Sequence, residues 1–124
     1  MFGMQIPSFM LKQMYKAGSL KNQTDCFEFT VCNPVMDATI VTVKELTVGG
    51  TTYRLEEVEF TQAEVTLPGT TVSEEQPVDF GKGDEVAIRV KGTTLNPGEH
   101  SILLHVHTVE FGSIRIEVQD TVRG

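Results

Sequence analysis

The sequence predicts an all-β fold, an immunoglobulin-like β-sandwich of about seven or eight antiparallel strands. Three observations predict it: short runs in which apolar and polar residues alternate, turn residues roughly every ten positions, and no helical periodicity after residue 22. A closed barrel is the alternative. No repeat or linker divides the chain, so we expect one domain over residues 23–124 behind an N-terminal arm over residues 1–22.

The arm does not alternate as a strand would. Its apolar residues follow Ser8 at helical spacings, which predicts one or two helical turns that end by Gly18. One interpretation is that the arm closes one end of the core. The other is that it binds a partner protein, because methionine side chains adapt to irregular surfaces. The predicted partner-contact residues are Phe9, Met10, Leu11, Met14 and Tyr15.

The remaining elements follow from alternation and turn residues. Gly49 and Gly50 predict a tight two-residue hairpin turn, and the polar stretch 70–84 predicts a long surface loop with one short edge strand. The predicted strands span residues 26–32, 38–48, 51–55, 63–67, 78–80, 86–90, 102–109 and 113–120.

Two cysteines lie on the first of these strands. Six residues of extended chain hold Cys26 and Cys32 roughly 20 Å apart, too far for a disulfide. No neighbouring base is visible that would activate either thiol, so we expect two reduced cysteines without a nucleophilic role.

The closing hairpin carries two of the three histidines. A three-residue loop over residues 110–112 predicts that His105 lies opposite Glu117 and His107 opposite Arg115. The carboxylate should then raise the pKa of His105 above that of His107. These two histidines are also weak candidates for zinc ligands, but the charge of Arg115 disfavours a cation there.

His100 follows the turn at Pro97 and Gly98. We expect it to have a structural role, with its imidazole bonded back to the backbone of that turn, as the tyrosine corner does in other sandwiches.

Charge excludes several function classes. Seventeen acidic and ten basic residues give a net charge of −7, which disfavours binding to nucleic acid or anionic lipid. Neither a secretory signal nor a membrane-spanning run is visible, so we expect a cytoplasmic protein. Without a recognisable catalytic motif or a tryptophan, the chain resembles neither a stand-alone enzyme nor a typical sugar-binding module.

Several motifs resemble the β subunit of bacterial C-glycoside deglycosidases, and the resemblance runs over nearly the whole chain. Its most specific parts are Ile6-Pro7-Ser8-Phe9, Gly18-Ser19-Leu20, Pro97-Gly98-Glu99-His100 and the closing strand from Gly112 to Asp120.

The resemblance implies an accessory, non-catalytic subunit of a hetero-oligomeric carbon–carbon lyase. That enzyme cleaves the bond between a 3-oxo-sugar and an aromatic aglycone, as in a flavonoid C-glycoside. The partner would be a larger α subunit of sugar-isomerase-like barrel type that holds a divalent metal and the acid/base residues. No catalytic, cofactor or metal residue carries over to this chain, which would be inactive alone. The alternative is a stand-alone β-sandwich that binds a protein or carbohydrate ligand.

Overall fold

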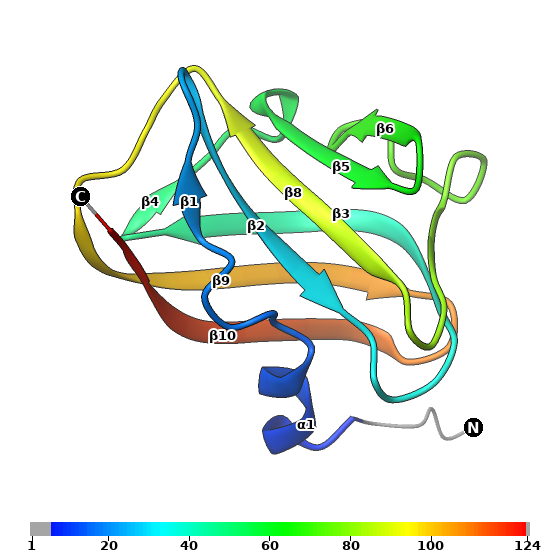
Figure 1. Cartoon of the computed structure of the whole chain (residues 1–124). Helices are drawn as coiled ribbons and strands as arrows, with labels where there is room; N and C mark the ends of the chain where they lie inside the picture. Colours follow the sequence, from blue (N-terminus) through cyan, green and yellow to red (C-terminus); the bar gives the residue numbers. More distant parts are fainter. Residues whose placement is uncertain (1–5, 124) are drawn as a thin grey trace.

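The computed structural model describes residues 6–123, which form two antiparallel sheets packed face to face (Figure 1). One short helix precedes the strands. In chain order the elements are α1 (Ser8–Gln13), β1 (Lys21–Asn22), β2 (Cys26–Cys32), β3 (Ala38–Val48), β4 (Thr51–Thr52), the 3-10 turn η1 (Leu55–Glu57), β5 (Val58–Gln62), β6 (Val65–Pro68), β7 (Val78–Phe80), β8 (Glu85–Lys91), β9 (Gly98–Thr108) and β10 (Gly112–Val122).

The two sheets enclose one apolar core. Sheet A has the strand order β1-β2-β8-β5-β6, and sheet B has the order β10-β9-β3-β4, with β7 also paired to β3. In β8 the alternate residues Val86, Ile88 and Val90 are fully buried, as the sequence pattern predicts. The predicted β-sandwich is confirmed. Among its largest buried side chains are Phe27, Phe29, Phe60, Phe80, Met14, Ile40, Leu46, Ile88, Ile102, Leu104 and Ile116.

Residues 6–123 form ten strands where the sequence predicted about seven or eight, because β5 and the two-residue strand β1 were not predicted. The predicted strand at 63–67 is one half of a hairpin whose other half, β5, the alternation did not reveal. Ala63 turns this hairpin at φ 56°, a left-handed conformation in a residue other than glycine. The predicted return strand 51–55 pairs only over Thr51–Thr52, since the chain then turns into η1.

The predicted register of the closing hairpin is wrong by two positions. β10 pairs with β9 so that Gly112 lies opposite Thr108 and Arg115 lies opposite His105. Thr108 decides the register: its buried hydroxyl accepts from the Phe111 backbone N–H at 3.0 Å and donates to the Gly112 carbonyl at 3.0 Å. The loop is therefore residues 109–111, and the Phe111 side chain folds into the core. A shift of two leaves every side chain on its predicted face.

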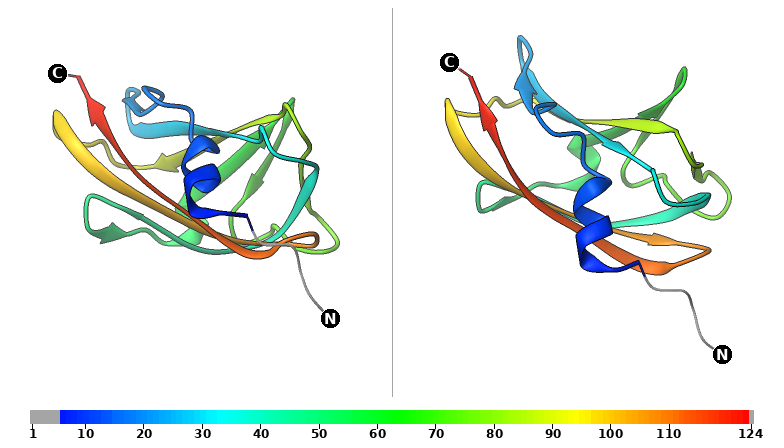
Figure 2. Two further views of the ribbon diagram at one scale, coloured as in Figure 1. Left: turned by 90° about the horizontal axis from the view of Figure 1, so that it is seen from below. Right: turned by 60° about the horizontal axis from the view of Figure 1, so that its bottom comes forward.

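Residues 6–22, here called the N-terminal segment, close the open side of the sandwich between β2 and β10. The Lys16 N–H donates to the Thr30 carbonyl at 3.0 Å, and the Cys32 N–H donates to the Met14 carbonyl at 2.6 Å. Figure 2 shows α1 in front of the gap between the sheets, beside β10. From Met14 onward the predicted arm is thus part of the sandwich; residues 1–5 lie outside the described part of the chain.

Candidate functional site

The predicted partner-contact residues divide into two groups in the structure. Phe9 is 65% exposed at the surface of α1, and Met10 and Leu11 are half-buried. Met14 and Tyr15 are 0% and 7% exposed and belong to the core, so in this fold a partner would reach only the other three. They are buried because the chain leaves α1 at Met14 and then bridges to Val31 of β2 through Tyr15.

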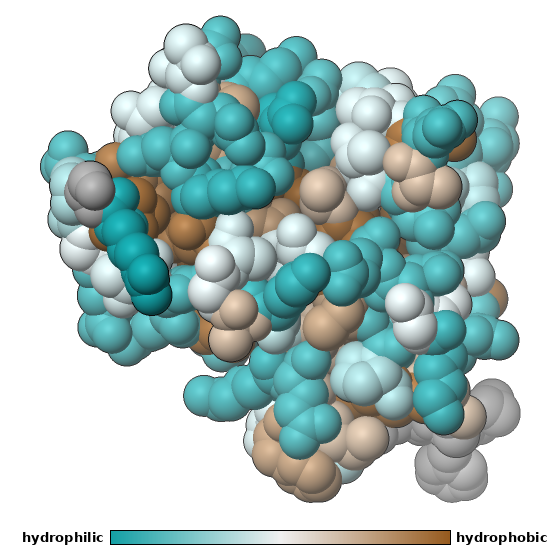
Figure 3. All heavy atoms as spheres, viewed as in Figure 1, coloured by the Kyte–Doolittle hydropathy of each residue, from teal (hydrophilic) through white to brown (hydrophobic). Residues whose placement is uncertain are grey.

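The apolar side chains of α1 gather at one end of the molecule. Figure 3 shows apolar atoms clustered over the helix at the bottom of the view. Beside the helix runs a shallow groove of about 390 Å³. Its lining consists of Ile6, Leu11, Phe111, Ser113, Ile114 and Arg115. We call the exposed side chain of Phe9 and the half-buried side chain of Met10 the helix patch.

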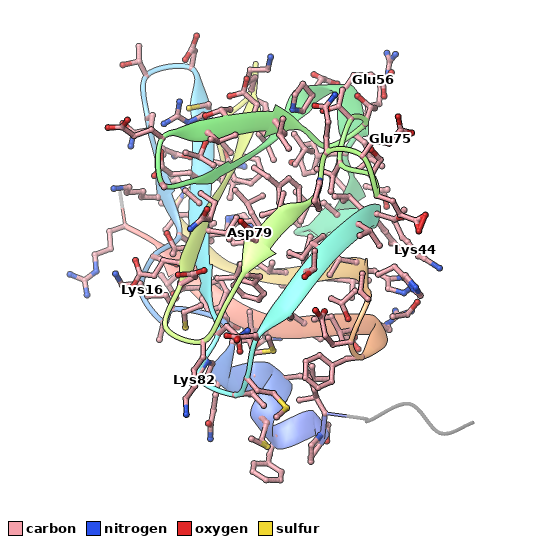
Figure 4. All side chains as sticks on the ribbon, turned by 90° about the vertical axis from the view of Figure 1, so that its right-hand side faces the viewer. Lys16, Lys44, Glu56, Glu75, Asp79 and Lys82 are labelled. Carbon is pink, nitrogen blue, oxygen red and sulfur yellow. The ribbon has the colours of Figure 1, made fainter. Side chains whose placement is uncertain are left out.

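Two lysines lie near α1 in a chain that is acidic overall. Lys16 follows α1 and pairs with Glu85 at 3.3 Å, where both side chains are about half exposed. Lys82 projects near the same end of the molecule (Figure 4). Such exposed ion pairs contribute little to stability.

Asp120 fixes the N-terminal segment to β10. Its Oδ2 accepts hydrogen bonds from the Tyr15 hydroxyl at 2.6 Å and from the backbone N–H groups of Gly18 and Leu20 at 3.0 and 3.3 Å. Burial alone would raise the pKa of Asp120, but these bonds and one from the Thr121 N–H outweigh it and lower the pKa. Burial and then Asp120 raise the pKa of Tyr15 above its ordinary value. The sequence holds no signal for this contact.

The two strand histidines face residues other than those predicted. His105 lies opposite Arg115, and His107 lies opposite Ser113, whose hydroxyl is 3.3 Å from Nδ1. Burial, then Arg115 and Lys44, lower the pKa of His105, and Glu45 opposes them only in part. Lys44 projects from the outer side of β3 (Figure 4). The expected rise in the pKa of His105 is therefore wrong, because it depended on the shifted register.

Metal ligands do not gather around these histidines. Within residues 6–123 no group of three or more His, Cys, Asp or Glu side chains is arranged to hold a metal ion. On β10 these two histidines lie opposite Arg115 and Ser113, and on β3 they lie opposite Glu45 and Thr42. The positive charges of Arg115 and Lys44 beside His105 disfavour a cation at this position.

The third histidine has the structural role that the sequence predicted. The Nε2 of His100 is 2.7 Å from the carbonyl oxygen of Asn96, at the start of the turn. Its ring also covers Gly49 in the β3–β4 turn, where a Cβ would lie 2.9 Å from Nδ1. His100 thus connects two turns.

Both cysteines are free thiols. Burial raises the pKa of Cys26 and of Cys32, which disfavours the thiolate form that a nucleophile or a metal ligand needs. The Cys32 sulfur is 3.5 Å from the Gln13 carbonyl oxygen, a weak donor contact at the end of α1.

The comparison with protein families corrects the resemblance drawn from motifs. Residues 10–123 match the family described as hydroxymethylglutaryl-CoA reductase, N-terminal domain. The identification with C-glycoside deglycosidase β subunits is therefore wrong, and the lyase activity and α subunit that it implied lose their only support. No curated protein sequence matches the chain. None of the helices within residues 6–123 has the length and apolar character needed to cross a membrane. The match covers almost the whole sequence, and the chain belongs to the family of hydroxymethylglutaryl-CoA reductase N-terminal domains.

Proposed function

We propose that this chain is a non-catalytic accessory domain that docks on the catalytic module of a hydroxymethylglutaryl-CoA reductase through the helix patch. The observation that carries the proposal is the exposure of Phe9, 65%, on a helix none of whose residues is buried. A large aromatic side chain exposed beside further apolar atoms is typical of a protein-binding surface. The family description supplies the kind of partner.

The charge of the chain supports a non-catalytic role. A reductase that acts on a CoA thioester must hold the phosphates of CoA and a hydride donor. Phosphates are held by basic clusters or by glycine-rich turns at helix N-termini, whereas this chain carries a net charge of −7 and the one α-helix within residues 6–123 has six residues. We therefore place catalysis outside this chain. We also infer a cytoplasmic location, which the two free cysteines support.

The test is binding to the catalytic module of the reductase encoded in the same genome, measured by isothermal titration calorimetry. Replacing Phe9 and Met10 by serine should weaken binding by about 2 kcal/mol, roughly thirtyfold, because an aromatic anchor is lost from the contact. The melting temperature should stay within about two degrees of the wild type, since neither side chain is fully buried.

Val65→Ser is the matched control, because Val65 is 61% exposed on β6, at the opposite edge of sheet A from β1. It should bind as the wild type does. Equal binding by all three proteins would contradict the helix patch as the contact. An intact fold without any binding to the module would overturn the accessory role and favour a stand-alone binding domain. Turnover of hydroxymethylglutaryl-CoA by the isolated chain would contradict the non-catalytic role.

A further inference from the structure

β10 is a long edge strand of sheet B whose outer side has no strand partner. It has eleven residues and pairs only with β9. In β9 the odd-numbered positions bond towards β3: the Ser101 carbonyl accepts from the Gly49 N–H at 2.8 Å, and the adjoining Val109 N–H donates to the Thr39 carbonyl at 3.0 Å. The backbone groups of even-numbered residues in β9 therefore point towards β10, where they form hydrogen bonds with the even-numbered residues of β10.

The odd positions of β10 consequently direct their backbone N–H and C=O groups away from the sheet. These positions are Ser113, Arg115, Glu117, Gln119 and Thr121. Of their N–H groups, that of Thr121 is bonded to the Asp120 carboxylate at 2.8 Å. Within residues 6–123, the other four N–H groups have no backbone partner on this outer side. Such a row of free groups is a template for another strand.

α1 covers this edge without bonding to it. Figures 1 and 2 show the helix beside the outer edge of β10. Its neighbour Ile6 and its residue Leu11 pack there, on the side of Ile114. Among the described residues, no hydrogen bond joins α1 to β10, none of the helix residues is buried, and no side chain caps its N-terminus. The cover is held by a small apolar contact only.

The charges of β10 fit a second copy of the same strand. In an antiparallel pair with a twofold axis at Ile116, Arg115 of one copy would lie opposite Glu117 of the other, and the reverse pair would form on the same face. In the single chain these two side chains are 3.8 Å apart and more than half exposed. Both lie at odd positions, so their free backbone groups would bond directly across the axis.

From this geometry we infer that β10 is a homodimerisation edge that α1 holds closed. When α1 is displaced, two chains join through residues 113–119 and sheet B becomes continuous across both copies. The paired span ends before Asp120, so the contacts that hold Tyr15, Gly18 and Leu20 stay in place. The net charge of −7 on each chain opposes unspecific association, so the two Arg–Glu pairs at the axis select this register.

The test displaces α1 in the full chain by replacing Ile6 and Leu11 with serine. Size-exclusion chromatography with light scattering should give a monomer for the wild type and a dimer for this variant at the same concentration. Phe9→Ser is the matched control, because Phe9 is 65% exposed and does not line the groove beside β10, and this variant should remain monomeric. The control also separates this inference from the proposed docking, which depends on Phe9 and does not depend on dimerisation.

Charge reversal then tests the register in the same background. Arg115→Glu alone and Glu117→Arg alone should each raise the dimer dissociation constant roughly tenfold or more, because each places like charges opposite one another twice. An equimolar mixture of the two reversed chains should dimerise again, since both cross-strand pairs become complementary. Circular dichroism checks that each chain is folded. If the serine variant unfolds, alanine replaces Ile6 and Leu11 in the same experiment.

A folded, monomeric variant at every concentration would overturn the inference. So would a dimer that is indifferent to both charge reversals, or association into species larger than a dimer, because these results require another surface.

Discussion

At the scale of single residues, Asp120 matters most for how the N-terminal segment is held. Three donors from that segment converge on one carboxylate oxygen, and the nearest, the Tyr15 hydroxyl, is 105 positions away in the sequence. Hydrogen bonds to a charged acceptor are stronger than those to a neutral one, so this single residue ties the segment to sheet B.

Replacing Asp120 by asparagine should lower the free energy of unfolding by about 1–2 kcal/mol, because the charged acceptor is lost while the side chain keeps its size. Tyr15→Phe should cost only about 1 kcal/mol, since it removes one of the three bonds and leaves the ring in the core. Chemical denaturation measures both changes. A larger loss for Tyr15→Phe than for Asp120→Asn would contradict the central place of the carboxylate.

The same contact predicts a pH dependence. Folding lowers the pKa of Asp120, so its contribution to stability is present above the pKa of the unfolded chain, about 3.9, and is lost as the pH falls through the lower folded value. Between about pH 5 and pH 2, the wild type should therefore lose more stability than Asp120→Asn does. Parallel pH profiles of the two proteins would exclude the contact as the cause.

His105 gives a second residue-scale prediction. Its pKa should lie below the ordinary value of 6.5, because burial and the positive charges of Arg115 and Lys44 disfavour the imidazolium. Replacing Arg115 by glutamine should raise that pKa. NMR titration of the imidazole measures it, and Arg123→Gln, a change at the far end of β10, is the control. An unchanged pKa in Arg115→Gln would argue against the observed register.

At the scale of elements, the β3–β4 turn depends on a residue of β9. Gly49 and Gly50 turn the chain at φ 60° and 84°, and the His100 ring leaves no room for a side chain at position 49. Gly112 has a similar φ of 68° but open space around it. A comparison of substitutions at Gly49 and Gly112 therefore separates the cost of backbone strain from the cost of the steric clash with His100.

Gly112→Ala should cost about 1 kcal/mol, the strain of a left-handed alanine alone. Gly49→Ala should cost more, because its Cβ also meets the imidazole. Combining Gly49→Ala with His100→Ala should recover part of that difference, which a double-mutant cycle by thermal or chemical denaturation would measure. If the stability losses of the two single variants simply add in the double variant, the His100 ring moves aside without cost in Gly49→Ala.

Alternation predicted elements better than it predicted their pairing. It placed β3 and β7 at their observed bounds and every residue of the closing hairpin on its correct face. It could not choose between registers that differ by two, because both bury the same residues. Thr108 makes that choice through two hydrogen bonds within the loop. The strand β5, in which Val58 and Phe60 are buried, was not predicted.

At the scale of the whole molecule, the sandwich was predictable, whereas the candidate site was predictable only in part. Helical spacing located α1 and its exposed Phe9, but it could not show that Met14 and Tyr15 turn into the core. Nor could it reveal Asp120, whose partners come together only in the folded chain. The motifs that suggested a deglycosidase subunit were mostly turns and alternating strands, which any sandwich of this size requires.

The packing of His100 against Gly49 has a consequence for how this family can change over time. A side chain at position 49 is compatible with the fold only when the residue at position 100 is smaller than histidine or absent from the turn. Conversely, loss of the imidazole removes the steric reason for glycine at position 49, and only the positive φ still favours glycine there. The two positions should therefore drift together among relatives, because their joint substitution costs less than the sum of the two separate changes.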